Sequence, residues 1–454
     1  MGEKIIILLL FFCMVAGIVS GPYLWNFSNG QSDITQKQKK KEAPEESTAN
    51  TTEKEEQVPI DYSTIRVLIS NRTLGKYNHD VVKITSDQDY FVKTEKKTVK
   101  KKAKAVTTLK YDKKKKGQTV TFSGTDKLRI LSIKRAYGTP AYRGTLEVKY
   151  ENGCFHVINQ LLLEEYLYAV IPSEMPVSYG SEALKVQAIC ARSFAVKQKK
   201  GKKFKSYGAD MDDSVASQVY NNTKECEESI RASVDTAGKV LTYDGEIVSA
   251  YFFSTSWGHT ADSHDVWLQK GKSPVYLTGK IQNDTDQNMD LSSDDEIKKF
   301  LNSDAETFDS SFPWYRWSVT IPVSRLSAAS VGSIRDIRVT KRGKSGVAKE
   351  LRITGSGGVR VIQGEYNIRA YLSPKGISIK RKDGSNGSAD ILPSGCFYIE
   401  EKGKRLIFHG GGYGHGVGMS QNGVKKQAEN GKRYSEILQF YYTGTKIKDI
   451  SECE

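Results

Sequence analysis

Apolar and polar residues alternate with a period of two in several short runs of the first third of the chain. Because successive side chains of a strand point to opposite faces of a sheet, this alternation is typical of strands with one buried face. The sequence therefore predicts a β-rich lobe over residues 61–141. The runs are IRVLIS (65–70), DVVKIT (80–85), TVTFSG (119–124), LRILSI (128–133) and GTLEVKY (144–150).

A helical pattern replaces this alternation from residue 161. Residues 161–170 predict a short helix that Pro172 stops, because proline lacks an amide donor and disfavours helical geometry for the residue before it. Between Pro172 and the next proline we expect an extended or turned backbone, and Glu174 lies there. A second helix is expected to begin near Ser178 or Ser181, either of which can cap it. Its apolar face is formed by Leu184, Ala188, Ala191 and Ala195.

Strand-like runs return in the last third of the chain. Together with the predicted helices they indicate an α+β fold, with a mixed α/β lobe over residues 142–454 after the β-rich N-terminal lobe. Residues 268–311 are polar and acidic apart from PVYL (274–277), so we expect an extended insertion or lid there. The further runs are 314–322, 334–342, 349–355, 358–364, 397–400 and 405–410.

The N-terminal segment has the composition of a membrane anchor. Residues 5–25 are uncharged and mostly apolar, and about 20 such residues span a bilayer as a helix. We expect residues 1–25 to form an uncleaved, single-pass signal-anchor in the cell membrane with the bulk of the chain extracytoplasmic; a cleaved signal peptide is the alternative. Residues 26–60 predict a disordered tether, because they contain almost no large apolar residue.

Positive charge is concentrated in one region. The formal net charge is +15, and between residues 93 and 116 many lysines face only Glu95 and Asp112. A solvated loop or exposed hairpin face is the simpler interpretation. The functional interpretation is attachment to a polyanion, for which anionic wall polymers or lipid headgroups are more natural than nucleic acid, since there is a predicted anchor and no nucleic-acid recognition motif.

Four ordered motifs resemble the stage II sporulation protein D family, which also includes the amidase enhancers. The resemblance covers residues 142–454. Ordered motifs of this kind are far more specific together than any one alone. They are SEMP with EALKVQAICARSFAV (173–176 and 182–196), YFFSTSWGHTADSHDVW (251–267), PVYL (274–277), and GYGHGVGMSQNG with YSEILQFYYTGT (412–423 and 434–445).

The resemblance implies a peptidoglycan lytic transglycosylase, which cleaves glycan strands between N-acetylmuramic acid and N-acetylglucosamine without a cofactor. It also implies a role in engulfment during sporulation or in wall remodelling, with a membrane-bound sporulation complex and an amidase as partners. The alternative is a non-enzymatic amidase enhancer that binds the wall and stimulates another hydrolase.

Glu174 matches the position of the family's proposed catalytic acid. A general acid needs a raised pKa at neutral pH, which burial provides and a neighbouring cation opposes. Lys185 and Arg192 lie seven residues apart on one stripe of the second helix. We therefore expect these cations to bind sugar or peptide groups, or to pair with another acid, rather than to contact Glu174.

The remaining candidates for substrate binding are Ser254, His259, His415, Ser420 and Gln421. Glycine-rich residues 410–423 fit neither a dinucleotide fingerprint nor a phosphate loop. We expect a role for this run in the substrate cleft, with tight packing against a strand as the alternative. Ser420 is also expected to cap a helix through residues 424–429 that Gly431 ends.

A metal site is not expected. Some family members bind zinc through histidines and cysteines in the region of His259 and His264, but here that region has no cysteine. Two histidines are too few for a closed zinc site. Tyr251, Trp267 and Trp314 can stack on sugar rings, as can Trp317, although core packing is the commoner fate of aromatic residues.

Overall fold

The computed structural model describes residues 62–453 except 202, 270, 272, 286–288 and 327–330. Strands and helices are mixed throughout this part, which confirms the α+β fold class. The anchor predicted for residues 1–25 and the tether predicted for residues 26–60 lie outside the described residues. Within the described residues, no helix combines the length and apolar character needed to cross a bilayer.

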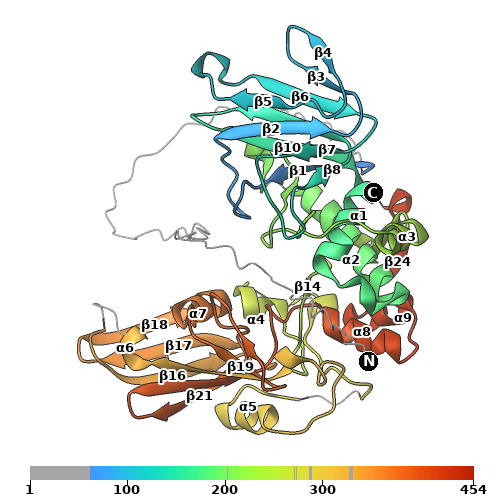
Figure 1. Ribbon diagram of the computed structural model, residues 1–454. Coiled ribbons are helices and arrows are strands. Elements are labelled where there is room, and N and C mark those ends of the chain that lie inside the picture. Colours follow the sequence, from blue (N-terminus) through green and yellow to red (C-terminus); the bar gives the residue numbers. More distant parts are fainter. Residues whose placement is uncertain are drawn as a thin grey trace, which may run out of the picture.

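Two sheets form the β-rich lobe at the top of Figure 1. The first has the order β11 (Met211–Asp212), β1 (Thr64–Ile69), β10 (Phe155–Leu162), β9 (Thr145–Tyr150), β6 (Thr119–Gly124), β3 (Tyr90–Lys93), β4 (Thr98–Lys101). The second has the order β5 (Thr107–Lys110), β2 (Val81–Ser86), β7 (Leu128–Ile130), β8 (Ala141–Tyr142). The predicted strands of this lobe are confirmed. The boundary predicted at residue 142 falls in β8 of the second sheet and also divides the first sheet, because β9 pairs with β6 and β10 pairs with β1.

The lysine-rich segment occupies the edges of both sheets. It supplies the edge strands β4 and β5 and a short 3-10 turn, Lys113–Lys115, which Asp112 caps. Lys113, Lys114 and Lys116 are exposed. The simpler interpretation, an exposed hairpin and loop, therefore describes its structure, and exposed lysines on edge strands also discourage edge-to-edge aggregation.

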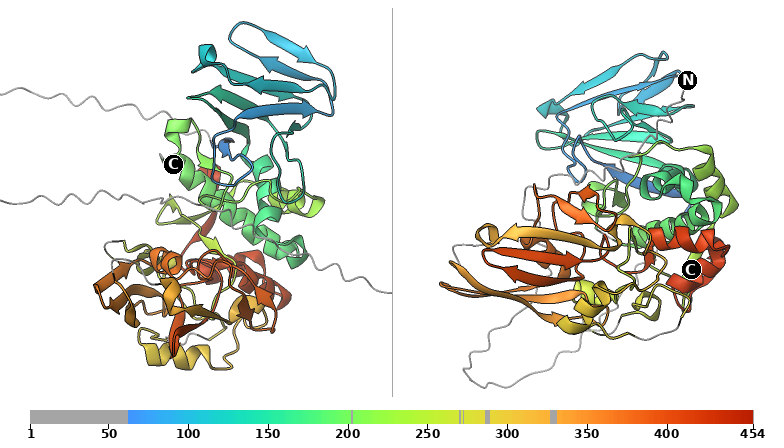
Figure 2. Two further views of the ribbon diagram at one scale, coloured as in Figure 1. Left: turned by 60° about the vertical axis from the view of Figure 1, so that its left-hand side comes forward. Right: turned by 60° about the horizontal axis from the view of Figure 1, so that its bottom comes forward.

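A layer of helices lies between the β-rich lobe and the lower lobe (Figures 1 and 2). It contains α1 (Leu163–Glu174), α2 (Ser181–Lys200) and α3 (Glu227–Asp235), which pack against one another. The predicted apolar face of the second helix is confirmed, since Leu184, Ala188, Ala191 and Ala195 are all buried. Ser181 is the first residue of α2, and Gly180 rather than a serine stands at its N-cap.

The prediction that Pro172 ends the first helix is wrong, because α1 continues through Pro172 to Glu174. Proline at position 172 cannot donate to the carbonyl of Tyr168, four residues earlier. Ser229 of α3 replaces that bond, donating its hydroxyl to the Tyr168 oxygen at 2.8 Å. Ser173 donates to the Ala169 carbonyl at 2.6 Å. These side-chain bonds stabilise the last turn, so Glu174 is the terminal helical residue and not part of a loop.

The C-terminal segment returns to the helical layer. There α8 (Gln421–Glu429) and α9 (Tyr434–Tyr441) pack against α2, and β24 (Lys446–Asp449) pairs with β12 (Lys239–Tyr243), beside β13 (Glu246–Ile247). The short strands β14 (Phe252–Phe253) and β23 (Met419–Ser420) pair in parallel. One continuous hydrophobic core joins the β-rich lobe, the helices and this segment.

The lower lobe has a second hydrophobic core, built from residues between Trp317 and Phe408. Its five-stranded sheet has the order β20 (Asn386–Gly387), β19 (Ile379–Arg381), β15 (Trp317–Pro322), β22 (Arg405–Gly410), β21 (Phe397–Lys402). Its three-stranded sheet is β16 (Ile334–Arg342), β17 (Ala348–Gly355), β18 (Gly358–Gln363), with helices α6 (Val323–Leu326) and α7 (Glu365–Tyr371). These strands confirm the runs predicted for the last third of the chain.

The acidic segment predicted as an insertion is partly folded into this body. It follows α4 (Ser263–Trp267), contains a 3-10 turn at Val275–Leu277 and α5 (Asp294–Leu301), and α5 packs against β21. Near its end, Asp309 is fully buried. At least this end of the segment is therefore part of the protein interior and not a lid.

Candidate active site

Glu174 is held at the end of α1 by two other segments of the chain. Its carboxylate accepts a hydrogen bond from the backbone N–H of Val219, with the nitrogen 2.5 Å from Oε1. Its backbone carbonyl accepts a hydrogen bond from the Gln421 side chain, 2.9 Å from Nε2. Because both contacts come from outside α1, the carboxyl group has a defined position relative to α8 and to the loop before α3.

The surroundings of Glu174 favour its protonated form. The residue keeps some solvent exposure, yet the protein packed around the carboxyl raises its pKa to about 7, against the smaller opposing effect of the Val219 hydrogen bond. A buried carboxyl shifts in this direction because the low-dielectric interior penalises the charged form. Near neutral pH this group can therefore both donate and accept a proton, as a general acid–base catalyst must.

The side chains at the start of α8 connect Glu174 to the core. Gln421 also approaches Gln187 of α2, with 3.3 Å between Nε2 and Oε1. Ser420 caps α8 by accepting a hydrogen bond from the Gly423 amide at 3.3 Å, and Gly431 follows its C-cap with a positive φ of 84°. Both ends of this helix confirm the prediction from sequence.

Asp309 is a buried acid next to this cap, and sequence reasoning did not single it out. Its carboxylate accepts hydrogen bonds from the hydroxyl of Ser420, and from the hydroxyl and amide of Ser256 at 2.8 and 2.9 Å. Burial raises its pKa to about 6, although these hydrogen bonds oppose the shift. Asp309 therefore joins the glycine-rich segment to residues 254–256. No motif marks it in the sequence; only its burial in the fold identifies it.

A second set of contacts joins the same segments. Asn422 donates to the Thr255 hydroxyl at 2.8 Å and accepts from the Tyr179 hydroxyl. The backbone N–H of Asn422 donates to the carbonyl of Ser254 at 3.0 Å. The half-buried Ser254 thus lies beside the residue that follows Gln421. The structure brings Glu174, Gln421, Ser420 and Ser254 into one neighbourhood.

Backbone hydrogen bonds also join the glycine-rich segment to residues 254–255. Besides the bond from the Asn422 amide to Ser254, the amides of Tyr413 and Thr255 each donate to the carbonyl of the other residue, at 2.8 and 3.1 Å. These bonds hold the glycine-rich segment along residues 251–257. The start of α8 is therefore fixed by backbone pairing as well as by side chains.

The two cations of α2 bind other acids and not the carboxylate of Glu174. Arg192 is fully buried, and its guanidinium binds both oxygens of Glu164, at 2.7 and 2.6 Å. Lys185 pairs with Glu182 at 3.3 Å and with Asp235 at 3.4 Å. These contacts match the expected alternative, pairing with another acid. They also leave the carboxyl of Glu174 free of the cationic neighbour that would have lowered its pKa.

His259 is buried. Its Nδ1 lies 2.6 Å from the carbonyl of Thr260, and burial lowers its pKa to about 4. His264 instead contacts Ser273, with 2.7 Å between Nδ1 and the hydroxyl. In the part of the chain that the structure describes, no group of three or more His, Cys, Asp or Glu side chains is placed to hold a metal ion.

His415 lies in an aromatic cluster rather than beside Glu174. Its ring is 5.6 Å from that of Trp267, which in turn lies 4.5 Å from the ring of Tyr251. The Nδ1 of His415 accepts a hydrogen bond from the Val417 amide at 3.0 Å, and burial lowers the His415 pKa to about 4. The imidazole is therefore neutral at neutral pH. Tyr251 and Trp267 remain partly exposed, whereas Trp317 is buried.

The glycines of residues 410–418 make close packing contacts. A Cβ at Gly416 would lie 2.4 Å from the ring of Trp257, and one at Gly418 would lie 2.2 Å from the carbonyl of Tyr251. Both glycines also have positive φ, 82° and 77°. A side chain is excluded at both positions. This arrangement is the tight packing that was the alternative to a role in the substrate cleft.

Comparison with known proteins gives matches over the same regions. A family model described as "Stage II sporulation protein" matches residues 151–243. The stage II sporulation protein D of Bacillus subtilis is 30% identical over 307 residues, which cover 64% of this chain and 76% of that protein. The chain belongs to the stage II sporulation protein D family. An uncharacterized protein of Brachyspira hyodysenteriae is 28% identical over 68% of this chain and 73% of its own length.

The stage II sporulation protein D family also includes a longer relative. The amidase enhancer of Bacillus subtilis is 29% identical over 294 residues, which cover 62% of this chain but only 40% of that protein. A second family model, "Domain of unknown function (DUF8618)", matches residues 261–418. This second match contains the whole lower-lobe core, while the first contains α1, α2 and α3 with Glu174. The comparisons thus assign the helical layer and the lower lobe to different family models.

Proposed function

We propose that this member of the stage II sporulation protein D family is a peptidoglycan lytic transglycosylase in which Glu174 is the catalytic acid and base. The feature that carries the proposal is a pKa raised to about 7 at Glu174, a residue that keeps some solvent exposure. A carboxyl of this kind is half protonated at neutral pH, where both of its protonation states are available for proton transfer.

The reaction assigns Glu174 two successive proton transfers. The protonated carboxyl first gives its proton to the glycosidic oxygen, and the bond between that oxygen and the anomeric carbon of N-acetylmuramic acid breaks. The resulting carboxylate then takes the proton of the primary hydroxyl of the same sugar, whose oxygen bonds to the anomeric carbon. The N-acetylglucosamine side leaves with a free hydroxyl, and the muramic residue ends as an anhydro sugar. Glu174 is protonated again at the end of the cycle.

The neighbouring acids support a mechanism with one carboxyl group. Hydrolysis of a glycosidic bond usually uses two carboxyls that flank it, one of which activates water or attacks the sugar. Asp309 is fully buried and accepts hydrogen bonds from Ser256 and Ser420. Glu164 is bound to Arg192, and Glu182 accepts from the Tyr434 amide at 2.7 Å. Each of these acids already has partners within the protein.

Substrate contacts are proposed for polar and aromatic side chains on α2, at the start of α8 and in residues 251–267. Ser254, Gln421 and Lys185 offer polar groups, and Tyr251 with Trp267 offers adjacent aromatic faces of the kind that stack on sugar rings. For Ser420, Arg192 and His259, the contacts within the protein support a positioning role instead. His415 is proposed to orient Trp267 within its aromatic cluster.

Cleavage of purified glycan strands by the full-length chain tests the proposal. The unmutated protein is expected to release products with anhydro-muramic ends, identified by mass spectrometry. Glu174→Gln keeps the shape and the acceptor for the Val219 amide but loses the exchangeable proton. General acid–base catalysis contributes about 10²–10⁴-fold to such reactions, so cleavage should fall by that order while strand binding persists.

The second candidate function is that of an amidase enhancer, favoured by the name of the Bacillus subtilis relative with 29% identity. In this role the chain binds the wall and stimulates a separate amidase, and Glu174 has no chemical function. Adding this chain should then increase the release of stem peptides by a separate amidase. The unmutated protein and Glu174→Gln should increase it equally. An enzyme and an enhancer are thus separated by one pair of assays.

Membrane attachment and electrostatic wall binding are proposed for the segments outside the active site. Residues 1–25 are proposed to anchor the chain in the cell membrane with its bulk extracytoplasmic, and residues 26–60 to act as the tether. The exposed lysines around the Lys113–Lys115 turn are proposed to contact anionic wall polymers. A membrane-bound sporulation complex and an amidase are the proposed protein partners. Protease treatment of intact protoplasts tests the orientation, since only an extracytoplasmic domain is digested.

A further inference from the structure

Four partly exposed aromatic side chains form two close pairs of rings. The ring centres of Tyr251 and Trp267 lie 4.5 Å apart, and those of Tyr243 and Tyr276 lie 5.4 Å apart. The first pair belongs to the proposed substrate contacts, whereas nothing in that proposal uses the second. The four rings are called the aromatic row below.

Ser249 joins the two pairs. Burial raises the pKa of both Tyr251 and Tyr276, and hydrogen bonding from Ser249 opposes the rise in each. The neighbouring Tyr251 hydroxyl adds to the rise at Tyr276. One tyrosine from each pair therefore lies against the same serine, so the two pairs form one continuous row.

The PVYL motif carries one ring of the row and is held in place at both of its ends. Before the motif, the hydroxyl of Ser273 accepts a hydrogen bond from the backbone N–H of His264 in α4 at 3.0 Å. After the motif, the amide of Thr260 donates to the carbonyl of Lys280 at 2.9 Å, and the amide of Lys280 donates to the Thr260 hydroxyl at 3.0 Å. The tyrosine of the motif thus has a fixed position beside α4.

Helix α2 relates the row to the candidate acid. Gln187 of α2 contacts Gln421, and Gln421 bonds Glu174. Phe194 follows seven residues later on α2, and its ring centre lies 5.7 Å from that of Tyr251. An α-helix rises by about 1.5 Å per residue, so the first pair lies about 10 Å along α2 from Gln187.

The second pair lies farther along the same helix. Lys197 of α2 pairs with Glu246 at 3.6 Å, and Glu246 is the strand partner of Tyr243 across the turn between β12 and β13. Lys197 is about 15 Å along α2 from Gln187. The order along the helix is therefore the candidate acid, the first pair and then the second pair.

The surface of the row suits an uncharged sugar. The residues next to two of its rings, Leu268 and Val275, are 44% and 51% exposed. Exposed apolar surface of this kind marks ligand-binding grooves. A sugar ring has an apolar face of C–H groups with hydroxyls around it, and a tyrosine offers an apolar face and a polar tip to match.

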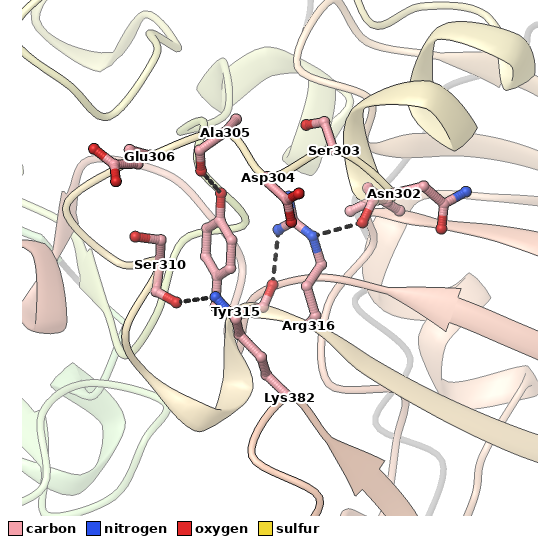
Figure 3. Close-up of a pocket in the computed structure, with 10 residues that line it drawn as sticks. Asn302, Ser303, Asp304, Ala305, Glu306, Ser310, Tyr315, Arg316 and Lys382 are labelled. Atoms are coloured by element: carbon pink, nitrogen blue, oxygen red, sulfur yellow. Dashed lines mark hydrogen bonds between the residues drawn. The ribbon is translucent and has the colours of Figure 1, made fainter.

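A cavity of about 350 Å³ on the lower lobe provides a contrast (Figure 3). Tyr315 lies in its wall but is only 2% exposed, and its hydroxyl donates to the carbonyl of Ala305 at 3.1 Å. The lining side chains are otherwise mostly polar or charged, among them Asn302, Asp304, Glu306 and Lys382. The aromatic row, and not this cavity, therefore has the chemistry of a sugar site.

We propose that Tyr243 and Tyr276 form a second aromatic subsite, which holds a sugar of the glycan strand beyond those at the bond next to Glu174. The separation of about 15 Å along α2 is longer than one sugar ring, so this sugar is a different one. It is N-acetylglucosamine, because the described contacts of the row offer ring faces and phenols rather than a cation for the carboxylate of N-acetylmuramic acid. The choice of glycan rests on the proposed function, whereas the position of the row does not.

Isothermal titration of the full-length chain with the dimer and the hexamer of N-acetylglucosamine tests the proposal. The hexamer should bind more tightly, since only the longer chain reaches from the candidate acid to the second pair. Tyr276→Ala should weaken hexamer binding by about threefold to tenfold, the effect of one aromatic contact. Tyr276→Phe keeps the ring and should bind the hexamer as the unmutated chain does.

Two further variants keep the test decisive. Tyr243→Ala removes the partner ring and should weaken the hexamer to the same extent, which provides a second measurement if Tyr276→Ala does not fold. Tyr366→Ala removes a tyrosine that is 62% exposed on α7 and outside the row, and it should have no effect. A hexamer that binds no more tightly than the dimer would overturn the subsite. So would hexamer binding that neither row variant weakens, the result expected if the row instead holds an apolar segment of a protein partner.

Cleavage of peptide-free glycan strands by the same variants separates this inference from the proposed function. Tyr276→Ala should raise KM for long strands several-fold and leave kcat nearly unchanged, because its ring lies away from Glu174. Hexamer binding that depends on Tyr276, in a chain that cleaves no glycan, would support the subsite and count against the transglycosylase. Cleavage whose KM responds to neither Tyr243 nor Tyr276 would overturn the subsite alone.

Discussion

Gln421 donates a hydrogen bond to the backbone carbonyl of Glu174, 247 residues earlier in the chain, with 2.9 Å between nitrogen and oxygen. The bond ties the end of α1 to the start of α8. Both residues belong to motifs of the stage II sporulation protein D resemblance, one at each end of the matched region. The contact gives the glutamine of the last motif a physical role, which is to fix the backbone that carries the candidate acid.

Replacing Gln421 by Leu should reduce glycan cleavage without unfolding the protein. The variant loses the bond to Glu174, so the carboxyl is held less firmly, and misplacement by about 1 Å can cost on the order of 100-fold in rate. We expect a loss of about tenfold to hundredfold in kcat, measured with peptide-free strands. Gln363→Leu is the matched control, because Gln363 is exposed on β18. An equal loss in both variants would contradict the positioning role.

The pH dependence of cleavage should report the pKa of Glu174. The first step needs its protonated form, and burial raises its pKa to about 7. Values of kcat/KM should therefore be constant on the acidic side and fall tenfold per pH unit above about pH 7. Asp309→Asn should leave this limb in place, since Asp309 is buried and bonded to serines. A rate that rises through pH 7 would mean that the carboxylate, not the acid, starts the reaction.

The folding stability of Glu174→Gln provides a check that does not depend on activity. A carboxyl whose pKa is raised in the folded protein destabilises that state once it ionises, so the stability of the unmutated chain should fall between about pH 4.5 and pH 7. A rise in the pKa from 4.5 to about 7 corresponds to about 3 kcal/mol, so the Gln variant, which lacks this charge, should be more stable by up to that amount at pH 8. The difference should vanish near pH 4. Denaturant unfolding at several pH values measures it, and a pH-independent difference would count against the raised pKa.

The two cations of α2 should differ in their effect on stability. Arg192 is fully buried and Glu164 is 32% exposed, so Arg192→Gln leaves a half-buried carboxylate without its cation and should cost about 2–4 kcal/mol. Lys185→Gln removes only partly exposed pairs and should cost less than about 1 kcal/mol. Denaturant unfolding compares the two. A small effect for Arg192 together with a large loss of glycan binding would restore its predicted role as a substrate ligand.

Binding to anionic wall polymers should depend on salt and on the lysines of the β-rich lobe. Exposed charges are screened beyond about 10 Å at 0.1 M ionic strength. A triple change of Lys113, Lys114 and Lys116 to Gln should weaken sedimentation with purified wall and flatten its salt dependence. The control makes the same charge change at Lys375, Lys402 and Lys404, which are exposed on the lower lobe. Equal weakening by both sets would show that net charge, and not this edge, determines binding.

Local patterns predicted the strands and the buried face of α2 because alternation and helical periodicity report burial directly. The end of α1 could not be predicted in this way. Pro172 signals a helix end, and the hydroxyl of Ser229 that replaces its missing bond comes from a helix much later in the chain. The same limit applies to the domain boundary, since pairing of β9 with β6 is a long-range property of the fold.

The candidate site could likewise be predicted only in part, because motifs identify residues but not the partners that the fold brings to them. Glu174 and Gln421 were chosen from motifs, and the fold places them in contact. Asp309 was not chosen, because a lone aspartate in an acidic segment looks like any solvated acid until its burial is known. The cations of α2 share a stripe, yet only the structure gives their acids, Glu164 for Arg192 and Glu182 with Asp235 for Lys185. Periodicity fixes which way a side chain points along its helix, not what it meets.

Cleavage of purified glycan strands in heavy-oxygen water tests the central claim most directly. If Glu174 transfers a proton to the glycosidic oxygen and the sugar's own hydroxyl closes the ring, the new muramic ends are anhydro sugars that contain no oxygen from the solvent. Mass spectrometry should find such ends with the unmutated chain and nearly none with Glu174→Gln. Solvent oxygen at the new ends would mean hydrolysis, and full cleavage by the Gln variant would remove Glu174 from the mechanism; either result would contradict the account.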